Sequence, residues 1–334
     1  MKVFVPGDGA MKCFSYETPV MTQSGSKLIG DLSGSAHKLL TQGGAWVNAP
    51  VSSSGAQKLM KVTLSRSGVM KVIHATPDHR WILSPLQRRF TLRKFTRDLK
   101  PKDRLAQIFP TRANVFELDA QGVARGFVFG DGAVSSPNRA CANFCGDKDM
   151  HLLPIFVGRF GLPARKYRAH TRVNGLPAEW KTQWPDLQKE TCEILYGWLS
   201  GYFAADGDVD KTGRPTLSSA NRANLDFTRE LCTRLGIGTF GIRQYDRRGF
   251  GKRISAIYLL GLMRKDLDAN FFQIPEHRRR FQNCVGRVAE RRAWTVVSVE
   301  ETARLEEVFC AVVDSTHSFA LEDNILVQSC WDER

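Results

Sequence analysis

The sequence feature that most constrains the fold is a pair of similar segments about 75 residues apart. Residues 124–132 read ARGFVFGDG and residues 199–207 read LSGYFAADG. Each is a short apolar run with small residues where a second helix can approach closely, and each ends in Asp-Gly before a strand-like run. We therefore predict an internal repeat, two copies of one supersecondary unit, each with a helix that another helix could approach closely.

The segments around this repeat have a different character. Residues 13–112 and 292–329 contain short strand-like runs broken by Gly, Ser and Pro, with clear candidates at 18–22, 59–64, 69–73 and 80–83 and a returning strand at 27–32. Residues 113–291 are mixed α and β and rich in Arg and aromatic residues. The pattern predicts an α+β fold in which an α/β domain interrupts an all-β domain, whose two halves meet in space.

The charge points to a polyanionic partner. The formal net charge is +14 at pH 7, which favours nucleic acid first and a membrane surface second, with simple solubility as the plain alternative. No apolar run approaches the ~20 residues that span a bilayer, and the N-terminus lacks the apolar core of a signal peptide. We therefore expect no membrane partner, a cytoplasmic location and a monomer.

Reactive residue types gather at two places in the β segments. Residues 308–330, VFCAVVDSTHSFALEDNILVQSC, hold two apolar runs around a turn at 314–317, and Cys330 follows at once. Apolar, core-forming residues therefore lie directly beside Cys330. This arrangement suggests that the peptide bond between residues 329 and 330 is itself a substrate. In the loop HATPDH, Pro77 stiffens the backbone, so that Thr76 and His79 could hold a peptide bond by two hydrogen bonds. None of the eight cysteines forms a CxxC pair, which disfavours a zinc ribbon.

The order of these motifs along the chain resembles that of an intein that carries a LAGLIDADG homing endonuclease. The resemblance covers residues 13–329. Residues 13–22, 76–79, 308–321 and 324–330 resemble the intein motifs, and the two Asp-Gly segments resemble the paired endonuclease helices. The resemblance implies a split all-β Hint (horseshoe) splicing domain, residues 13–112 and 292–329, with an inserted pseudo-twofold α/β LAGLIDADG endonuclease domain, residues 113–291. Residues 1–12 and 330–334 would be remnants of the host exteins.

The resemblance also implies a chemistry that needs no cofactor for splicing. The Cys13 thiol attacks the carbonyl of Lys12, assisted by Thr76 and by His79, which donates to the departing nitrogen. Cys330 then attacks the thioester. Cys310 stands where the family has an Asp or a Cys that coordinates the steps, and His317 stands where a histidine assists cleavage at the second junction.

The chain departs from the family at the terminal step. Gln328-Ser329 replaces the usual His-Asn before Cys330. Serine has no side-chain amide and cannot cyclise, and Gln328 cannot act as an acid or base. We predict that this step is blocked and that the precursor is trapped. The change at residues 328 and 329 could be engineered, or the chain could be a naturally degenerate intein.

For the inserted domain the resemblance implies cleavage of double-stranded DNA, the intein-less allele of the host gene. Asp131 and Asp206 would hold Mg²⁺ against the scissile phosphates. Lys166 and Lys252 are candidates for a basic residue beside this site. The candidate DNA-binding residues are basic and lie on or near strand-like runs: Arg165, Lys166, Arg168, Arg172, Arg243, Arg247, Arg248, Lys252 and Arg253.

Two other interpretations stay open. The inserted domain could be a LAGLIDADG DNA-binding protein that has lost catalysis, in which case it would bind DNA without nicking it. A hedgehog-type autoprocessing domain shares the β fold, but it would need a sterol-recognising tail and no cysteine after the last strand. The presence of Cys13 and Cys330 at the two edges of the β segments favours the intein interpretation over both.

Overall fold

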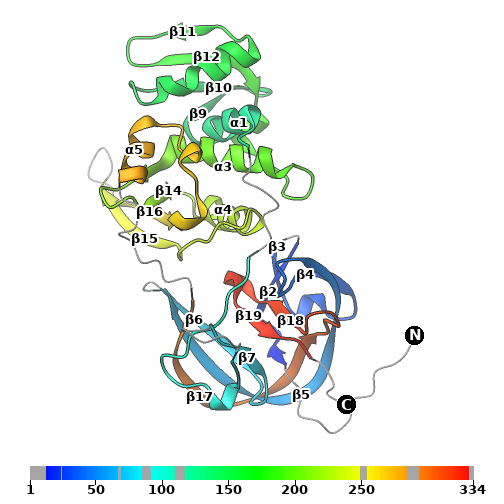
Figure 1. Ribbon diagram of the computed structural model, residues 1–334. Helices are drawn as coiled ribbons and strands as arrows, with labels where there is room; N and C mark the ends of the chain where they lie inside the picture. Colours follow the sequence, from blue (N-terminus) through cyan, green and yellow to red (C-terminus); the bar gives the residue numbers. More distant parts are fainter. Residues whose placement is uncertain are drawn as a thin grey trace. The chain divides into compact units, whose positions relative to one another are not determined.

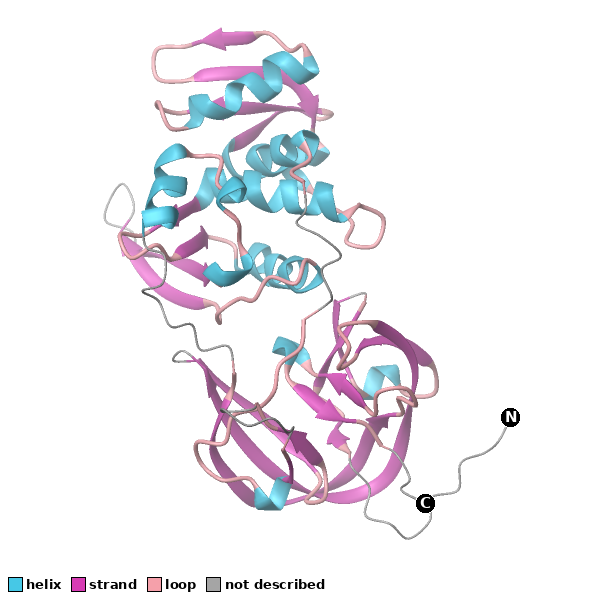
Figure 2. Cartoon of the chain, in the orientation of Figure 1, coloured by secondary structure: helices cyan, strands magenta, loops and turns pink. Residues whose placement is uncertain are grey.

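The computed structural model describes residues 13–23, 25–66, 69–84, 92–109, 117–248, 254–283 and 293–330. The chain divides into two compact units, one of Met1–Thr111 with Arg291–Arg334 and one of Arg112–Glu290 (Figure 1). The regular secondary structure in the described part of the first unit is strand apart from short 3₁₀ turns, whereas the second unit combines helices and strands (Figure 2). The α+β class expected from the sequence is therefore confirmed.

The first unit is built on two antiparallel sheets. A seven-stranded sheet has the order β17-β1-β6-β5-β4-β2-β3, and a four-stranded sheet has the order β18-β19-β7-β8. The strands of the N-terminal segment are β1 (Phe14–Ser15), β2 (Pro19–Thr22), β3 (Gly25–Leu28), β4 (Ala36–Leu40), β5 (Trp46–Arg66), β6 (Val69–Ala75), β7 (Arg80–Ile82) and β8 (Arg93–Phe95). Those of the C-terminal segment are β17 (Thr295–Ala311), β18 (Ser318–Ala320) and β19 (Leu326–Gln328).

Strands from the two segments of this unit pair directly. The long strands β5 and β17 run antiparallel from Ser65 opposite Thr295 to Val51 opposite Ala311, with three register shifts. β1 pairs with β17, and β19 pairs with β7. Apolar residues of both segments share one core, which includes Phe14, Trp81 and Phe319. Neither segment can form this core alone, because each supplies only part of the buried apolar surface.

One element of this unit differs from the sequence expectation. The strand expected at residues 27–32 is wrong in its second half, because the strand is Gly25–Leu28 and Gly30–Leu32 is a 3₁₀ turn. Gly30 explains the change. A Cβ at this position would lie 1.9 Å from Tyr16 Cδ2, so the chain packs closely against the Tyr16 ring.

The second unit consists of two halves with the same strand order. The first half holds α1 (Ala120–Asp131), β9 (Gly132–Ser136), β10 (Arg139–Phe144), β11 (Ala164–Lys166), β12 (Thr171–Pro177) and α2 (Glu179–Thr182). The second half holds α3 (Cys192–Asp206), β13 (Gly207–Val209), β14 (Pro215–Ser219), α4 (Arg222–Arg234), β15 (Arg243–Arg248), β16 (Ile254–Gly261) and α5 (Pro275–Asn283). The sheets read β9-β10-β12-β11 and β13-β14-β16-β15, so the internal repeat is confirmed.

Helices α1 and α3 pack with their backbones nearly in contact. A Cβ added to Gly126 would lie 1.9 Å from the carbonyl oxygen of Trp198, and one added to Gly201 would lie 1.9 Å from that of Val123. Small residues spaced four apart allow such an approach, because they fall on one helix face. As the sequence predicts, each helix ends at its Asp, Asp131 or Asp206, and the following Gly begins a strand. No helix in the described ranges is long and apolar enough to cross a membrane.

Candidate functional site

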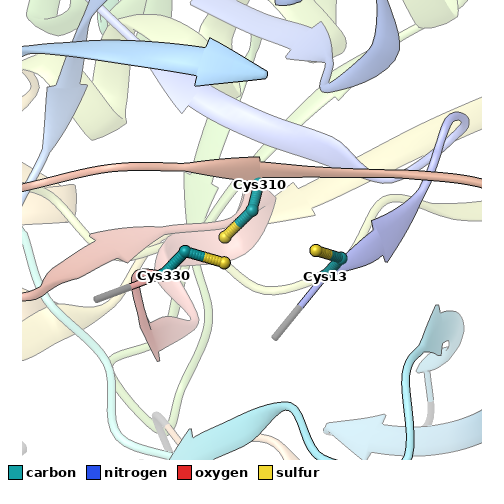
Figure 3. Close-up of side chains that lie close together, drawn as sticks. All are labelled: Cys13, Cys310 and Cys330. Carbon is teal, nitrogen blue, oxygen red and sulfur yellow. The ribbon is translucent and has the colours of Figure 1, made fainter. Parts of the chain in front are cut away.

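Three thiols from distant parts of the sequence meet inside the first unit. The Sγ atoms of Cys13, Cys310 and Cys330 all lie within 4.8 Å of one another (Figure 3). Cys13 and Cys310 are buried, and Cys330 is partly exposed. Each was singled out from the sequence, and the structure brings all three together. We call this group the thiol cluster.

Strand pairing accounts for the position of each thiol. Cys13 precedes β1, whose Phe14 pairs with Phe309 on β17, next to Cys310. The amide of Cys330 donates to the carbonyl of Ala311 at 3.2 Å, which fastens the end of the C-terminal hairpin beside Cys310. The cluster therefore depends on the association of the two β segments.

Thr76 and His79 lie beside the cluster in the loop between β6 and β7. The amide of Cys13 donates to Thr76 Oγ1 at 3.1 Å, and the amide of Thr76 donates to the carbonyl of Cys13 at 3.0 Å. Thr76 thus makes two hydrogen bonds to residue 13, one through its side chain and one through its backbone amide. That Thr76 and His79 together hold a peptide bond stays a prediction. The fully buried His79 ring packs 4.1 Å from Phe14 and 5.4 Å from Trp81 between ring centroids.

The thiols shift one another's acidity. Hydrogen bonds from Cys310 and then Cys330 lower the pKa of Cys13 to about 4, against the opposing effect of burial. The hydrogen bond to Cys13 is the largest cause that raises the pKa of Cys330 to about 12, and burial raises the pKa of Cys310 well above its usual range. Thiolate character is therefore concentrated on Cys13, which is the form of cysteine that acts as a nucleophile.

Replacement of Cys310 by alanine should shift the titration of Cys13. The variant loses the largest contribution that lowers the pKa of Cys13, so the pKa should rise from about 4 toward the ordinary 9.0. As the pH falls, the thiolate should then be lost at a higher pH than in the parent chain. The measurement is ultraviolet thiolate absorbance against pH, with Cys13→Ala as the blank. An unchanged titration would show that Cys310 does not stabilise the thiolate.

The residues before Cys330 are buried with unsatisfied polar atoms. Gln328 and Ser329 are 2% and 0% exposed. Within the described residues, Gln328 Oε1 and Ser329 Oγ have no hydrogen-bond partner. The amide of Ser329 donates to the carbonyl of His317 at 2.9 Å, so His317 lies against this end of the chain. Buried polar atoms without partners are unusual and often mark functional positions.

In the second unit, two carboxyl groups lie at adjacent helix ends. Burial and then the charges of Asp206 and Asp149 raise the pKa of Asp131 to about 6. Burial also raises the pKa of Asp206, while Lys181 and Lys148 oppose the shift. The close approach of α1 and α3 is the cause of this proximity. A Cβ at Gly130 on α1 would lie 3.3 Å from Asp206 Oδ2.

The cations beside these carboxyl groups were not identified from the sequence. Lys181 on α2 donates to the carbonyls of Phe129 and Gly130 at 2.7 and 2.8 Å, in the last turn of α1. Lys148, in the loop after β10, acts on the pKa of both carboxyl groups. Lys166, expected in this role, lies instead on β11, at the sheet edge opposite β9. Lys252 lies outside the described residues.

Several candidate DNA-binding residues share the face of the first sheet that is turned away from the core. Ala140 and Ala142 of β10 are core residues, so the alternating residue Asn143 lies on the opposite face. Asn143 pairs with Arg172, which pairs in turn with Arg165. Arg172 Nε donates to Asn143 Oδ1 at 2.9 Å. Lys166 alternates to the other face, and Arg168 is exposed in the loop between β11 and β12.

The second sheet places arginines in the same way. Leu217 of β14 and Leu260 of β16 belong to the core. Their neighbours Ser218 and Leu259, which pair with each other, therefore lie on the opposite face. Arg243 of β15 pairs with Leu259 and shares that face. Arg247 alternates onto the same face as Arg243, and both are exposed. Arg248 ends β15, and nothing is described of its side chain. Arg253 lies outside the described residues.

Comparison with known proteins gives a match to part of the repeat region. Residues 193–265 match the family model of a LAGLIDADG-like domain, a range that runs from α3 to the turn after β16. Over 235 residues the chain is 26% identical to the ribonucleoside-diphosphate reductase large subunit of Invertebrate iridescent virus 6. The match covers 66% of this chain but only 24% of that relative.

Two solved structures represent the structural neighbours. The homing endonuclease I-DmoI in complex with DNA and Ca is 13% identical, with a TM-score of 0.36, and the match covers 49% of this chain and 97% of that one. A Ssp DnaB mini-intein variant is 12% identical, with a TM-score of 0.34, and the match covers 96% of this chain and 99% of that one.

Proposed function

We propose that this chain is an intein-type protein-splicing element with an inserted LAGLIDADG DNA endonuclease. The observation that carries the proposal is the thiol cluster, in which Cys13 and Cys330, from opposite ends of the sequence, have Sγ atoms within 4.8 Å. Acyl transfer from one thiol to the other requires this proximity, and effective molarities of ~10⁵ M or more are available from such positioning. The strand-paired β segments are the proposed splicing domain.

In the first proposed step, Cys13 Sγ attacks the carbonyl carbon of Lys12, which lies outside the described residues. The peptide C–N bond breaks, a thioester forms, and the nitrogen of Cys13 takes up a proton. The hydrogen bond from this nitrogen to Thr76 Oγ1 orients the leaving group. We assign the proton donation to His79, whose ring packs against the neighbouring Phe14.

The acidities of the thiols favour an ordered second step. Cys330 is held protonated while it hydrogen-bonds to the Cys13 thiolate, the largest cause of its raised pKa. Acylation of Cys13 removes that thiolate, so the pKa of Cys330 should then fall. Cys330, which is partly exposed, loses its proton to water. Its Sγ attacks the thioester carbon, the bond to Cys13 Sγ breaks, and Cys13 regains a thiolate. Cys330 thus becomes a competent nucleophile only after Cys13 has reacted.

The proposed terminal step stops at residue 329. Cyclisation needs a side-chain amide at this position, and Ser329 supplies only a hydroxyl. His317, whose carbonyl accepts from Ser329, is assigned the assisting role at this junction. The chain is therefore proposed to accumulate as an unspliced precursor that can still form its thioester.

Incubation with a small external thiol tests the first step. Thiolysis of the thioester should release residues 1–12, with a new N-terminus at Cys13, and intact mass measurement detects both products. A sample that keeps its full mass under these conditions would contradict the proposed thioester.

For the second unit, the proposed activity is cleavage of double-stranded DNA. The donor set fits a divalent cation, because two partly buried carboxyl groups with raised pKa values gain from a shared positive charge. Asp131 and Asp206 would hold Mg²⁺, which would stabilise charge at the scissile phosphate. Lys181 and Lys148 add fixed positive charge at this place, and the arginines on the outer sheet faces would contact phosphates.

A plasmid that carries the codons for residues 1–12 joined to those for residues 330–334 serves as the DNA substrate. We expect Mg²⁺-dependent double-strand cleavage, reduced at least about 10²-fold by Asp131→Asn or Asp206→Asn, the range for loss of one electrostatic stabiliser. Asp226→Asn, an exposed change on α4, is the control. Binding of this plasmid without any nicking would favour the alternative function, a LAGLIDADG DNA-binding protein without catalysis.

A further inference from the structure

A buried ionic cluster surrounds the turn between β18 and β19, away from the thiols. Arg66 Nη2 lies 3.6 Å from Asp323 Oδ1, and Lys71 Nζ lies 2.7 Å from Asp323 Oδ2. The Arg66 and Asp323 side chains are only 3% and 6% exposed. The Arg66 guanidinium also stacks 4.7 Å from the centroid of the Trp294 ring. Buried charges persist only when they are paired, so this cluster fixes the turn to strands β5 and β6.

The same turn has an unfavourable backbone conformation. Asp323 and Asn324 have φ values of 62° and 63°, and His317 on the other side of β18 has 50°. Among the described residues that are not glycine, only Lys102 also has a positive φ. Left-handed conformations cost free energy outside glycine and persist where the surroundings enforce them. Here the two salt bridges to Asp323 supply that enforcement.

This turn determines where the reactive end of the chain lies. In the β18–β19 hairpin, Ser318 pairs with Gln328 and Ala320 with Leu326, and the next residues are Ser329 and Cys330. A slip that keeps the same faces inward must move the strand by two residues, or about 6.6 Å. That displacement is larger than 4.8 Å, the distance within which the three Sγ atoms all lie, so it would remove Cys330 from the thiol cluster. Correct register is therefore a condition for transfer to Cys330.

We infer that Asp323, paired with Arg66 and Lys71, is a positioning residue for the second step of splicing. It sets the hairpin register that delivers Cys330 and His317, without touching the reacting atoms. The inference rests on the proposed splicing function and adds to it a group outside the thiol cluster. The first step should not require Asp323, because Cys13 and Thr76 are held by β1 and by the loop after β6.

The test uses the chain with Gln328→His and Ser329→Asn, which supplies the missing terminal amide, as parent. Into it we place Asp323→Asn or Asp323→Gly. Asparagine and glycine both tolerate a positive φ, so these changes remove the charge at position 323 and still allow the left-handed backbone conformation. Asp314→Asn, an exposed change in the turn before β18, is the matched control. Thiol-induced release of residues 1–12 measures the first step, and release of residues 13–329 with a joined peptide measures the whole reaction.

We expect Asp323→Asn and Asp323→Gly to slow splicing at least about tenfold, since small misplacements of reacting groups cost up to ~10²-fold. Thiol-induced release should fall no further than in a Cys330→Ala chain, because a displaced Cys330 removes only that one hydrogen bond from Cys13. If either variant fails to fold, Lys71→Met replaces it in the test, because this change leaves the Arg66–Asp323 pair in place. We expect it to slow splicing much more than thiol-induced release, as for the Asp323 variants.

Two results would overturn the inference: splicing at the parental rate in the variants, or an equal loss of both reactions, which would indicate general destabilisation. A parent that releases no fragment at all would instead refute the proposed splicing function, and the inference with it.

Discussion

Replacement of Gly201 by alanine is expected to destabilise the unit of residues 117–283 by about 3 kcal/mol or more, at the upper end of the cost of overpacking. The added Cβ would lie 1.9 Å from the carbonyl oxygen of Val123 and 2.8 Å from the amide nitrogen of Phe127. Both contacts are with helix backbone, which cannot rotate away as a side chain can. Helices α1 and α3 would have to separate, and Asp131 and Asp206 with them.

Calorimetry of the whole chain measures this effect, because we expect the two compact units to unfold in separate transitions. Gly158→Ala is the matched control, since no atom lies within 4 Å of a Cβ at this exposed helical position. Alanine is the better helix former there by up to about 1 kcal/mol. Equal shifts in the two variants would contradict the backbone-to-backbone packing of α1 and α3.

Replacement of Cys13 by alanine is expected to abolish thiol-induced release of residues 1–12. Cys13 is the only thiol of the cluster whose pKa is lowered, to about 4, and it alone adjoins the bond to be broken. Cys330→Ala should retain the release, slowed by less than about tenfold, because it removes only the second-largest contribution to the acidity of Cys13.

Mass spectrometry after a timed incubation with thiol separates these outcomes. Release from the Cys13→Ala chain would show that another group breaks the bond, and the assignment of Cys13 would be wrong. Loss of release in Cys330→Ala, with the fold intact by calorimetry, would indicate that the thiols act as one unit in the first step.

The helical repeat could be predicted because its signal is local. Apolar residues, small residues spaced four apart and a terminal Asp-Gly occur together in residues 124–132 and 199–207, and each feature has a direct structural consequence. The structure confirms both helix ends and the equivalent sheets that follow them. The meeting of Cys13, Cys310 and Cys330 was anticipated for a different reason, namely the order of motifs along the chain.

Other parts of the candidate sites could not be read from local patterns. Lys181 reaches the end of α1 from a short helix after β12, and no periodicity links it to Asp131. The salt bridges from Arg66 and Lys71 to Asp323 join residues more than 250 positions apart. Their burial is evident only after β5, β6 and the terminal hairpin have assembled. Such long-range charge pairs depend on tertiary packing rather than on sequence spacing.

The proposed splicing function requires that the thiol cluster performs acyl transfer between Cys13 and Cys330. Intact mass measurement on the chain with Gln328→His and Ser329→Asn tests it most directly. We expect two new species, a fragment of residues 13–329 and a joined peptide of sequence MKVFVPGDGAMKCWDER. A folded chain that remains at its full mass, both alone and after treatment with an external thiol that would cleave any thioester, would contradict the proposed transfer and would leave only the proposed DNA-directed function of the second unit.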